Sequence, residues 1–123
     1  MRNVLIVDND PGAMFWLAEV LVSANFQPWP ACTIPDAISL AGSKCMSPLD
    51  LAIVNPSLRG AADLISHLRR HRANLRVLAL GHKTTSLRGV DSWLEIPNSA
   101  DGSAKQKWTR AINRVCSGYR RAA

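Results

Sequence analysis

Cysteines are few in this sequence, and they are widely spaced. Cys32, Cys45 and Cys116 are the three cysteines among 123 residues, and neither a CxxC pair nor a histidine cluster accompanies them. An odd number of scattered cysteines does not suit a disulfide framework, and structural zinc sites need closely spaced ligands. We therefore expect a fold that forms without disulfides or metal, in the reducing environment of the cytoplasm.

Long apolar stretches are also absent. A transmembrane helix needs about 20 consecutive apolar residues, and no stretch of this sequence approaches that length. The first ten residues, MRNVLIVDND, pass from a short apolar run directly into acidic residues. This is not the pattern of a signal peptide, so we expect neither secretion nor contact with a membrane.

Acidic residues are scarce relative to basic ones. Lys and Arg number 15 and Asp and Glu number 9, which gives a formal net charge of +6 and a pI near 9.9. Such an excess is typical of proteins that bind polyanions, including nucleic acids. The length of 123 residues and the 47% of hydrophobic residues predict a single domain over residues 1–123.

The apolar residues alternate between short runs and longer amphipathic segments. The short runs predict five strands, at Val4–Val7, Phe26–Ala31, Leu49–Val54, Val77–Leu80 and Trp93–Ile96. The longer segments predict four helices, over Pro11–Ala24 after the cap Asp10, from the cap Thr33 to Leu40, over Ala61–Arg72 and over Ser103–Val115. Strands interleaved with helices predict a doubly wound α/β fold, whose parallel sheet is covered on both faces.

Ligands of such sheets gather at the carboxyl ends of the strands. The residues that directly follow the predicted strands are therefore the first candidates for a functional site. They include Asp8–Asp10, Asn55–Gly60, Gly81 with His82, and Ile96 with Pro97. No glycine-rich phosphate loop follows the first predicted strand, which argues against a nucleotide site.

Three of these strand ends together resemble a known family. The runs VLIVDND (Val4–Asp10), LDLAIVNPSLRG (Leu49–Gly60) and WLEIP (Trp93–Pro97) are similar, in order and spacing, to the receiver domain of two-component response regulators. The resemblance implies a CheY-like, five-stranded parallel sheet of order 2-1-3-4-5 and a role in signal transduction. It also implies that the 123 residues form one receiver-like unit with no separate output domain.

The resemblance also implies a phosphoryl-accepting pocket, but most of its residues differ here. The acceptor aspartate corresponds to Asn55, the second acidic residue to Asn9, the hydroxyl residue to Gly81 and the lysine to Ile96, whereas Asp8 is retained. An amide cannot form the acyl phosphate that a carboxylate forms by nucleophilic attack. We therefore interpret the chain as a degenerate pseudo-receiver with no catalytic residue, acting by protein–protein contacts independently of phosphorylation.

Metal binding is expected to be lost with the acidic residues. Mg²⁺ is held by oxygen ligands, among which carboxylates are the usual protein contribution, and only Asp8 remains of the family's set. We expect weak or absent Mg²⁺ binding, no metal site and no cofactor. Pro97 is retained after Ile96. A phosphoacceptor that uses another residue, such as Asp8 or Ser57, is the alternative.

Two further features of the family are altered in the second half of the chain. Trp93 corresponds to the aromatic residue that moves when the family's hydroxyl residue binds phosphate, and Gly81 leaves room beside it. Two interpretations of Trp93 stay open: its indole is held permanently in one orientation, or it packs as an ordinary large aromatic residue. The connection His82–Ser92 is short and contains Gly89, which predicts a shortened or missing fourth helix.

The first predicted helix has little charge on its outer side. Met14, Phe15, Ala18 and Val22 lie there in addition to the residues needed for a sheet-facing stripe. Such a face predicts a contact with a protein partner, which the resemblance specifies as a histidine kinase, a regulator or a second copy in a homodimer. Cover by the C-terminal helix is the alternative.

The basic residues cluster on the third and last predicted helices. The candidate basic patch comprises Arg69, Arg70, Arg72, Lys105, Lys107, Arg110 and Arg114. It supports a second hypothesis, a nucleic-acid-binding regulatory module, although no helix-turn-helix and no interleaved aromatic residues accompany it. His67 and His71 are four residues apart, but the glutamate of an HExxH metal motif is missing, so a solvated helix face is the simpler interpretation.

Overall fold

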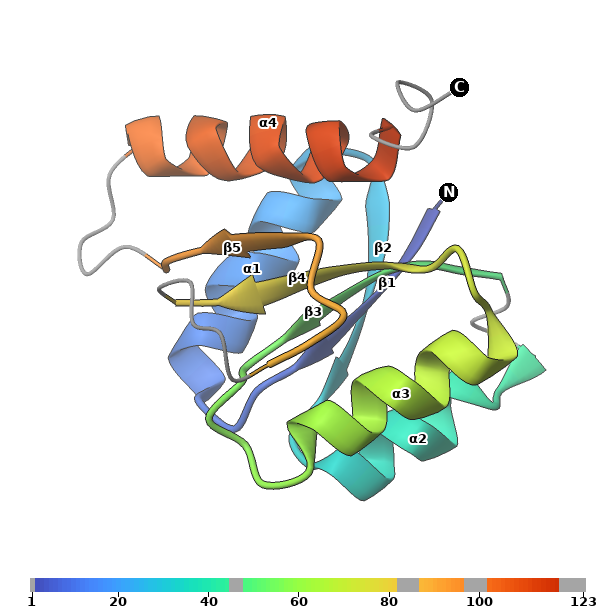
Figure 1. Cartoon of the computed structure of the whole chain (residues 1–123). Coiled ribbons are helices and arrows are strands. Elements are labelled where there is room, and N and C mark those ends of the chain that lie inside the picture. The colour runs from blue at the N-terminus through green and yellow to red at the C-terminus, as the bar shows by residue number, and fades with distance from the viewer. Residues whose placement is uncertain (1, 45–47, 82–86, 97–101, 118–123) are drawn as a thin grey trace.

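The elements of the fold follow the predicted alternation of strands and helices. A computed structural model describes residues 2–44, 48–81, 87–96 and 102–117. Their order is β1 (Arg2–Val7), α1 (Pro11–Ser23), β2 (Phe26–Ala31), α2 (Ile34–Ala41), β3 (Leu49–Val54), α3 (Ala61–His71), β4 (Arg76–Leu80), β5 (Ser92–Leu94) and α4 (Gly102–Ser117) (Figure 1). Each predicted element is confirmed, with ends that differ by at most two residues.

The sheet has five parallel strands in the order β2-β1-β3-β4-β5. This confirms the predicted doubly wound α/β class and the strand order. The interior position of β1, between β2 and β3, explains its continuous apolar sequence. Val4 and Ile6 belong to one buried cluster and Leu5 and Val7 to the other, because successive side chains of a strand point to opposite faces.

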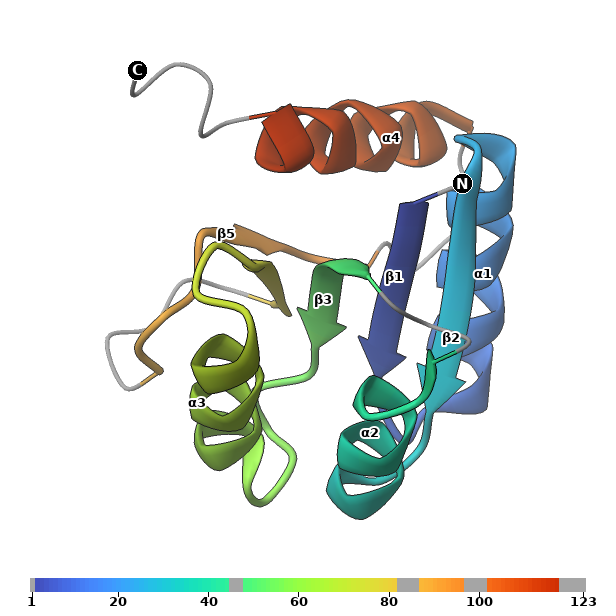
Figure 2. The same ribbon diagram turned by 90° about the vertical axis from the view of Figure 1, so that its right-hand side faces the viewer.

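Two helices cover each face of the sheet. Helices α2 and α3 lie together on one face, whereas α1 and α4 cover the other (Figures 1 and 2). Trp108 of α4 lies at the centre of the α1–α4 side and is 1% exposed. Its indole N–H donates a hydrogen bond to the carbonyl of Glu95 (2.9 Å), and its ring meets Trp16 edge to face at 5.8 Å. These contacts attach α4 to α1 and to the residues after β5.

Side-chain caps begin the first two helices directly after their strands. Asp10 accepts a hydrogen bond from the backbone N–H of Gly12 (3.0 Å), and Thr33 accepts one from that of Asp36 (3.2 Å). Both caps were predicted from the sequence. With Asp10 as the cap, only Asp8 and Asn9 lie between β1 and the cap of α1, so these two residues lie at the carboxyl edge of the sheet.

An ion-pair network attaches the β4–β5 connection to α3. The guanidinium of Arg69 donates to the carbonyl of Gly89 (2.6 Å) and to a carboxylate oxygen of Asp91 (2.9 Å), while Arg76 lies 3.5 Å from the other oxygen. The backbone N–H of Val77 also donates to Asp91 (2.8 Å). In the described part of this connection, Gly81 and residues 87–91, there is no helix; residues 82–86 of the predicted shortened helix lie outside the described residues.

None of the helices, over the described ranges, combines the length and the apolar character that a membrane span requires.

Replacing the tryptophan of α4 tests the packing on the α1–α4 side. Trp108→Ala removes a fully buried indole and its hydrogen bond, and we expect it to lower the free energy of unfolding by about 3–5 kcal/mol. Urea unfolding followed by far-UV circular dichroism measures the change. Arg110→Ala, at an exposed position of the same helix, is the matched control and should change the free energy by less than about 0.5 kcal/mol. Equal effects of the two variants would contradict this account.

Candidate functional site

The ends of β1 and β3 bring two predicted site residues together. The backbone N–H of Asn55 donates to the carbonyl of Val7 (2.9 Å), and that of Asp8 donates to Ala31 (3.2 Å). These bonds continue the strand ladders by one residue, so Asp8 and Asn55 begin their loops side by side. The sequence analysis predicted this meeting at the carboxyl edge.

Asp8 is buried, and one of its carboxylate oxygens accepts several local hydrogen bonds. Its side chain is 3% exposed, the one buried polar or charged residue in the described part of the chain. A single carboxylate oxygen, Oδ1, accepts from the backbone N–H groups of Asn9 (2.7 Å) and Asp10 (3.3 Å) and from the side-chain amide of Asn55 (2.9 Å). Hydrogen bonds of this kind stabilise a buried negative charge without a counter-ion.

The orientation of the Asn55 amide is set by its second partner. The backbone N–H of Ser57 can only donate, and it lies 2.9 Å from Asn55 Oδ1. Oδ1 must therefore face Ser57, which leaves the Nδ2 donor for the carboxylate of Asp8. The side chain consequently bridges the loop after β3 to the loop after β1, with both of its polar ends in use.

These residues do not fit a magnesium ion. Mg²⁺ requires oxygen ligands in octahedral geometry, but the group that Asn55 presents to Asp8 is an N–H donor. Three N–H donors already converge on Asp8 Oδ1. The side chain of Asn9 is exposed, and it adds a neutral amide where the family has a carboxylate. The groups around Asp8 Oδ1 are therefore hydrogen-bond donors and not ligands for a cation.

Gly81, which the resemblance aligns with a hydroxyl residue, has a backbone conformation that favours glycine. Its φ is +108°, a conformation that residues with a side chain rarely adopt. A Cβ built at this glycine meets no atom within 4 Å, so space alone does not exclude a larger residue. Its N–H donates to the carbonyl of Leu94 (2.9 Å). A hydroxyl residue here requires a change of backbone conformation.

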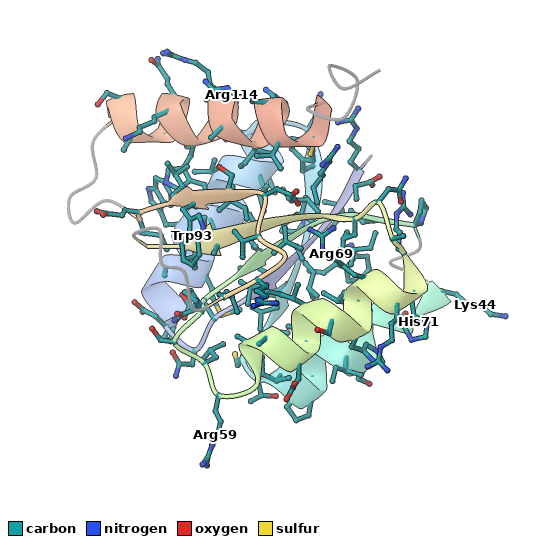
Figure 3. The ribbon with its side chains drawn as sticks, viewed as in Figure 1. Lys44, Arg59, Arg69, His71, Trp93 and Arg114 are labelled. Atoms are coloured by element: carbon teal, nitrogen blue, oxygen red, sulfur yellow. The ribbon has the colours of Figure 1, made fainter. Side chains whose placement is uncertain are left out.

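The remaining pocket positions lie on or after β5. Ile96, at the family's lysine position, is half-buried and packs against the α1–α4 core, which is a structural role for an apolar side chain. Pro97 lies outside the described residues. Trp93 is half-buried on β5 opposite Ala79 of β4 (Figure 3).

The exposed apolar face of α1 contains fewer residues than the sequence predicted. Phe15 and Val22 are 68% and 58% exposed, and Ala18, which lies between them, is half-buried. The prediction was wrong for Met14, which is only 8% exposed and belongs to the core beneath α1 and α4. The helix rotates Met14 toward the sheet because it lies three residues before Leu17, a core residue. The apolar face therefore consists of Phe15, Ala18 and Val22.

The predicted basic patch is divided between opposite faces of the sheet. Arg69, Arg70 and Arg72 belong to the end of α3, whereas Lys105, Lys107, Arg110 and Arg114 belong to α4 (Figures 1 and 3). Arg69 is held by Asp91, and Arg72 lies 3.8 Å from Asp50. These seven residues therefore do not form one continuous surface.

A buried thiol lies near the end of α4. Burial raises the pKa of the Cys116 thiol above its ordinary value, an effect that the nearby Arg2 partly opposes. The thiol therefore stays protonated at neutral pH, and the reactive form of a cysteine is the thiolate. This suits a structural role for Cys116 and not the role of a nucleophile.

The structure matches solved receiver domains over nearly its whole length. A response-regulator receiver domain protein from Clostridium thermocellum has a TM-score of 0.75 at 16% identity, with 100% of both chains covered. A CheY-like receiver domain protein from Methanospirillum hungatei JF-1 has 0.77 at 14% identity, covering 100% of this chain and 99% of its own. The beryllofluoride-activated NtrC4 receiver domain dimer has 0.76 at 17% identity, covering 97% and 99%.

Sequence comparisons add nothing to this likeness. No protein-family model matches the chain, and no curated protein matches it. At identities of 14 to 17%, the structural matches establish the fold alone. The chain has a receiver-like fold, as the resemblance implied, and the chemistry of its pocket has to be judged on its own residues.

A change at Asn55 tests the hydrogen bond that joins the two loops. Asn55→Asp places a second carboxylate against buried Asp8, where like charges repel. We expect the free energy of unfolding at pH 7 to fall by about 1–3 kcal/mol, and MgCl₂ to restore part of that loss. Urea unfolding with and without MgCl₂ measures both effects. Asn55→Ala, which removes the hydrogen bond without adding charge, is the control and should not respond to Mg²⁺. Identical Mg²⁺ dependence of the wild type and Asn55→Asp would contradict this interpretation.

Proposed function

We propose that this chain is a pseudo-receiver, a signalling domain that acts through protein contacts and does not accept a phosphoryl group. It is not an enzyme in this proposal and needs no cofactor. The observation that carries the proposal is the hydrogen bond from the Asn55 amide to buried Asp8 (2.9 Å). In this arrangement Asn55, at the acceptor position, donates a hydrogen bond to Asp8, the retained acidic residue, so each side chain is the partner of the other.

The other positions of the pocket support the same conclusion. Phosphoryl transfer needs groups that stabilise the charge of the transferred phosphoryl group. Gly81 provides no hydroxyl, and its backbone conformation disfavours any residue with a side chain. Ile96 packs against the core at the position where a lysine would be needed. Restoring a single residue therefore does not restore the reaction in this proposal, because Asn55, Gly81 and Ile96 each lack a group that the reaction needs.

The exposed side of α1 is the proposed contact surface for a protein partner. Phe15 and Val22 are seven residues apart and so lie on one stripe of the helix, with Ala18 between them. They are two of the three large hydrophobic side chains exposed in the described part of the chain. The partner is a histidine kinase, a regulator or a second copy. One structural neighbour is itself described as a receiver domain dimer. A cytoplasmic location is part of the proposal.

Binding to nucleic acid is the weaker alternative. Its strongest feature is α4, where Lys107, Arg110 and Arg114 are exposed on one stripe at intervals of three and four residues. The arginines of α3 lie on the opposite face of the sheet and cannot extend this stripe. One short basic stripe offers few phosphate contacts.

Acetyl phosphate tests the loss of phosphoryl transfer. We expect no phosphoryl adduct in the intact mass of the protein after incubation with acetyl phosphate and Mg²⁺, because Asn55 is not a nucleophile. A receiver domain with a complete pocket, treated in parallel, is the positive control. A stoichiometric adduct on this chain would overturn the proposal, and peptide mapping would then distinguish Asp8 from Ser57 as its site.

A charge on α1 tests the contact surface. Phe15→Glu places a carboxylate in the centre of the apolar stripe, where its desolvation opposes association. We expect it to reduce self-association or binding of a purified partner at least tenfold, measured by light scattering or by titration. Ile38→Glu is the matched control, since Ile38 is also an exposed large hydrophobic residue (37%) but lies on α2. The surface is wrongly assigned if the two variants behave alike.

A further inference from the structure

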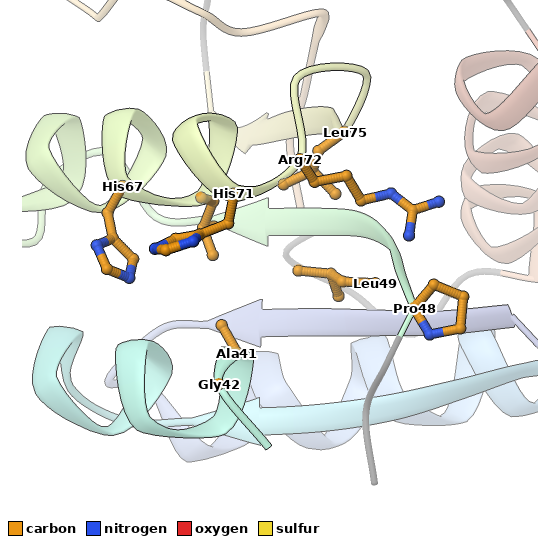
Figure 4. A pocket seen from close by; sticks show the side chains of 9 residues that line it. Ala41, Gly42, Pro48, Leu49, His67, His71, Arg72 and Leu75 are labelled. Carbon is orange, nitrogen blue, oxygen red and sulfur yellow. The ribbon is translucent and has the colours of Figure 1, made fainter. Parts of the chain in front are cut away.

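A cavity of about 330 Å³ lies between the ends of α2 and α3 and the start of β3. Ala41 and Gly42 line it from α2, Pro48 and Leu49 from the start of β3, and His67, Leu68, His71, Arg72 and Leu75 from α3 and the residues after it (Figure 4). It lies at the amino end of β3, whereas Asn55 follows the carboxyl end of the same strand. The cavity is therefore separate from the Asp8–Asn55 site, and the inference does not depend on the proposed function.

The interior of this cavity is apolar and its rim is basic. Leu49, Leu68 and Leu75 are buried residues of the α2–α3 core, and they give the cavity a rigid hydrocarbon wall. Its polar side chains are His67, His71 and Arg72, which all come from the end of α3. Pockets of a few hundred cubic ångströms with an apolar lining and a few convergent polar groups are the usual form of small-molecule sites.

The polar groups of the rim have few partners of their own. Among the described residues, the guanidinium of Arg72 has one neighbour of opposite charge, Asp50, at 3.8 Å, which is too long for a hydrogen bond. His67 and His71 contact each other edge to face, with ring centroids 4.7 Å apart, and neither imidazole has a hydrogen bond within the described part of the chain. Donors of hydrogen bonds thus border the apolar cavity, and the ion pair with Asp50 leaves N–H groups of the Arg72 guanidinium for a further partner.

We propose that this cavity binds a small organic carboxylate with an apolar body, such as an aryl or branched alkyl acid. The planar guanidinium of Arg72 suits a carboxylate because its N–H groups can donate to both oxygens. The imidazoles of His67 and His71 line the same cavity, on the side away from the guanidinium (Figure 4), and the leucine wall accommodates the hydrocarbon part. A transition metal is less well served, because the described residues contain no group of three or more metal-ligating side chains.

Phenylacetate is a suitable probe for this site. Titration of the ¹⁵N-labelled full chain should give saturable shifts of amide signals around the cavity, at Gly42, Leu49 and Leu75, and of the His67 and His71 ring signals. Signals near Asn55 should stay unchanged. The neutral analogue phenylacetamide should bind at least about tenfold more weakly, since a hydrogen bond to a charged group is lost.

Three variants test the contributions of the Arg72 charge and of the cavity volume to binding. Arg72→Gln should weaken phenylacetate about tenfold or more, while Arg70→Gln, on the same helix but outside the cavity, should leave the affinity unchanged. Ala41→Leu should abolish binding by filling the space, because the Ala41 methyl points into the cavity (Figure 4). Dispersed amide spectra verify that each variant is folded.

Two results would overturn the proposal. The first is phenylacetate shifts that do not saturate or that survive both Arg72→Gln and Ala41→Leu in folded protein. The second is a saturable response of the His67 and His71 signals to ZnCl₂ with none to phenylacetate, which would identify a two-histidine metal chelate instead.

Discussion

The buried carboxylate of Asp8 has to be satisfied by hydrogen bonds, and this constraint organises the carboxyl edge of the sheet. β1 ends between two covered faces, so the residue that follows it is removed from water. The backbone N–H groups of Asn9 and Asp10 supply two donors, and Asn55 supplies a third from the neighbouring strand. In this chain three amide N–H groups stabilise the charge of that carboxylate. The loops after β1 and β3 are thereby held together in one arrangement.

The helices and strands could be predicted from the sequence because their signals are local, whereas the strand order came from the family resemblance. Short apolar runs mark strands that are buried on both faces, and Asp10 and Thr33 are side-chain caps that place the starts of two helices. The meeting of Asp8 and Asn55 also follows from local signals, since parallel strands end at the same edge. The bond between their side chains could not be predicted, because it depends on the rotamer that the Ser57 N–H imposes on Asn55.

Features that depend on three-dimensional arrangement were missed. The φ of Gly81 cannot be read from the residue, and the burial of Met14 depends on how α1 is rotated against the sheet. The predicted basic patch placed Arg69 together with the arginines of α4, but in the fold Arg69 forms an ion pair with Asp91. The spacing of His67 and His71 was visible, whereas the cavity beside them exists only because α2 and α3 end at the same edge.

The central claim is that the Asp8–Asn55 site is closed to both metal and phosphoryl group. The most direct measurement is titration of the ¹⁵N-labelled chain with MgCl₂ and then with beryllium fluoride, a phosphoryl mimic, followed through the amide signals of residues 8–10, Asn55 and Ser57. This account predicts that these signals stay unchanged at millimolar Mg²⁺, with and without the mimic. Saturable shifts of these signals, extending to Gly81 when the mimic is added, would contradict it.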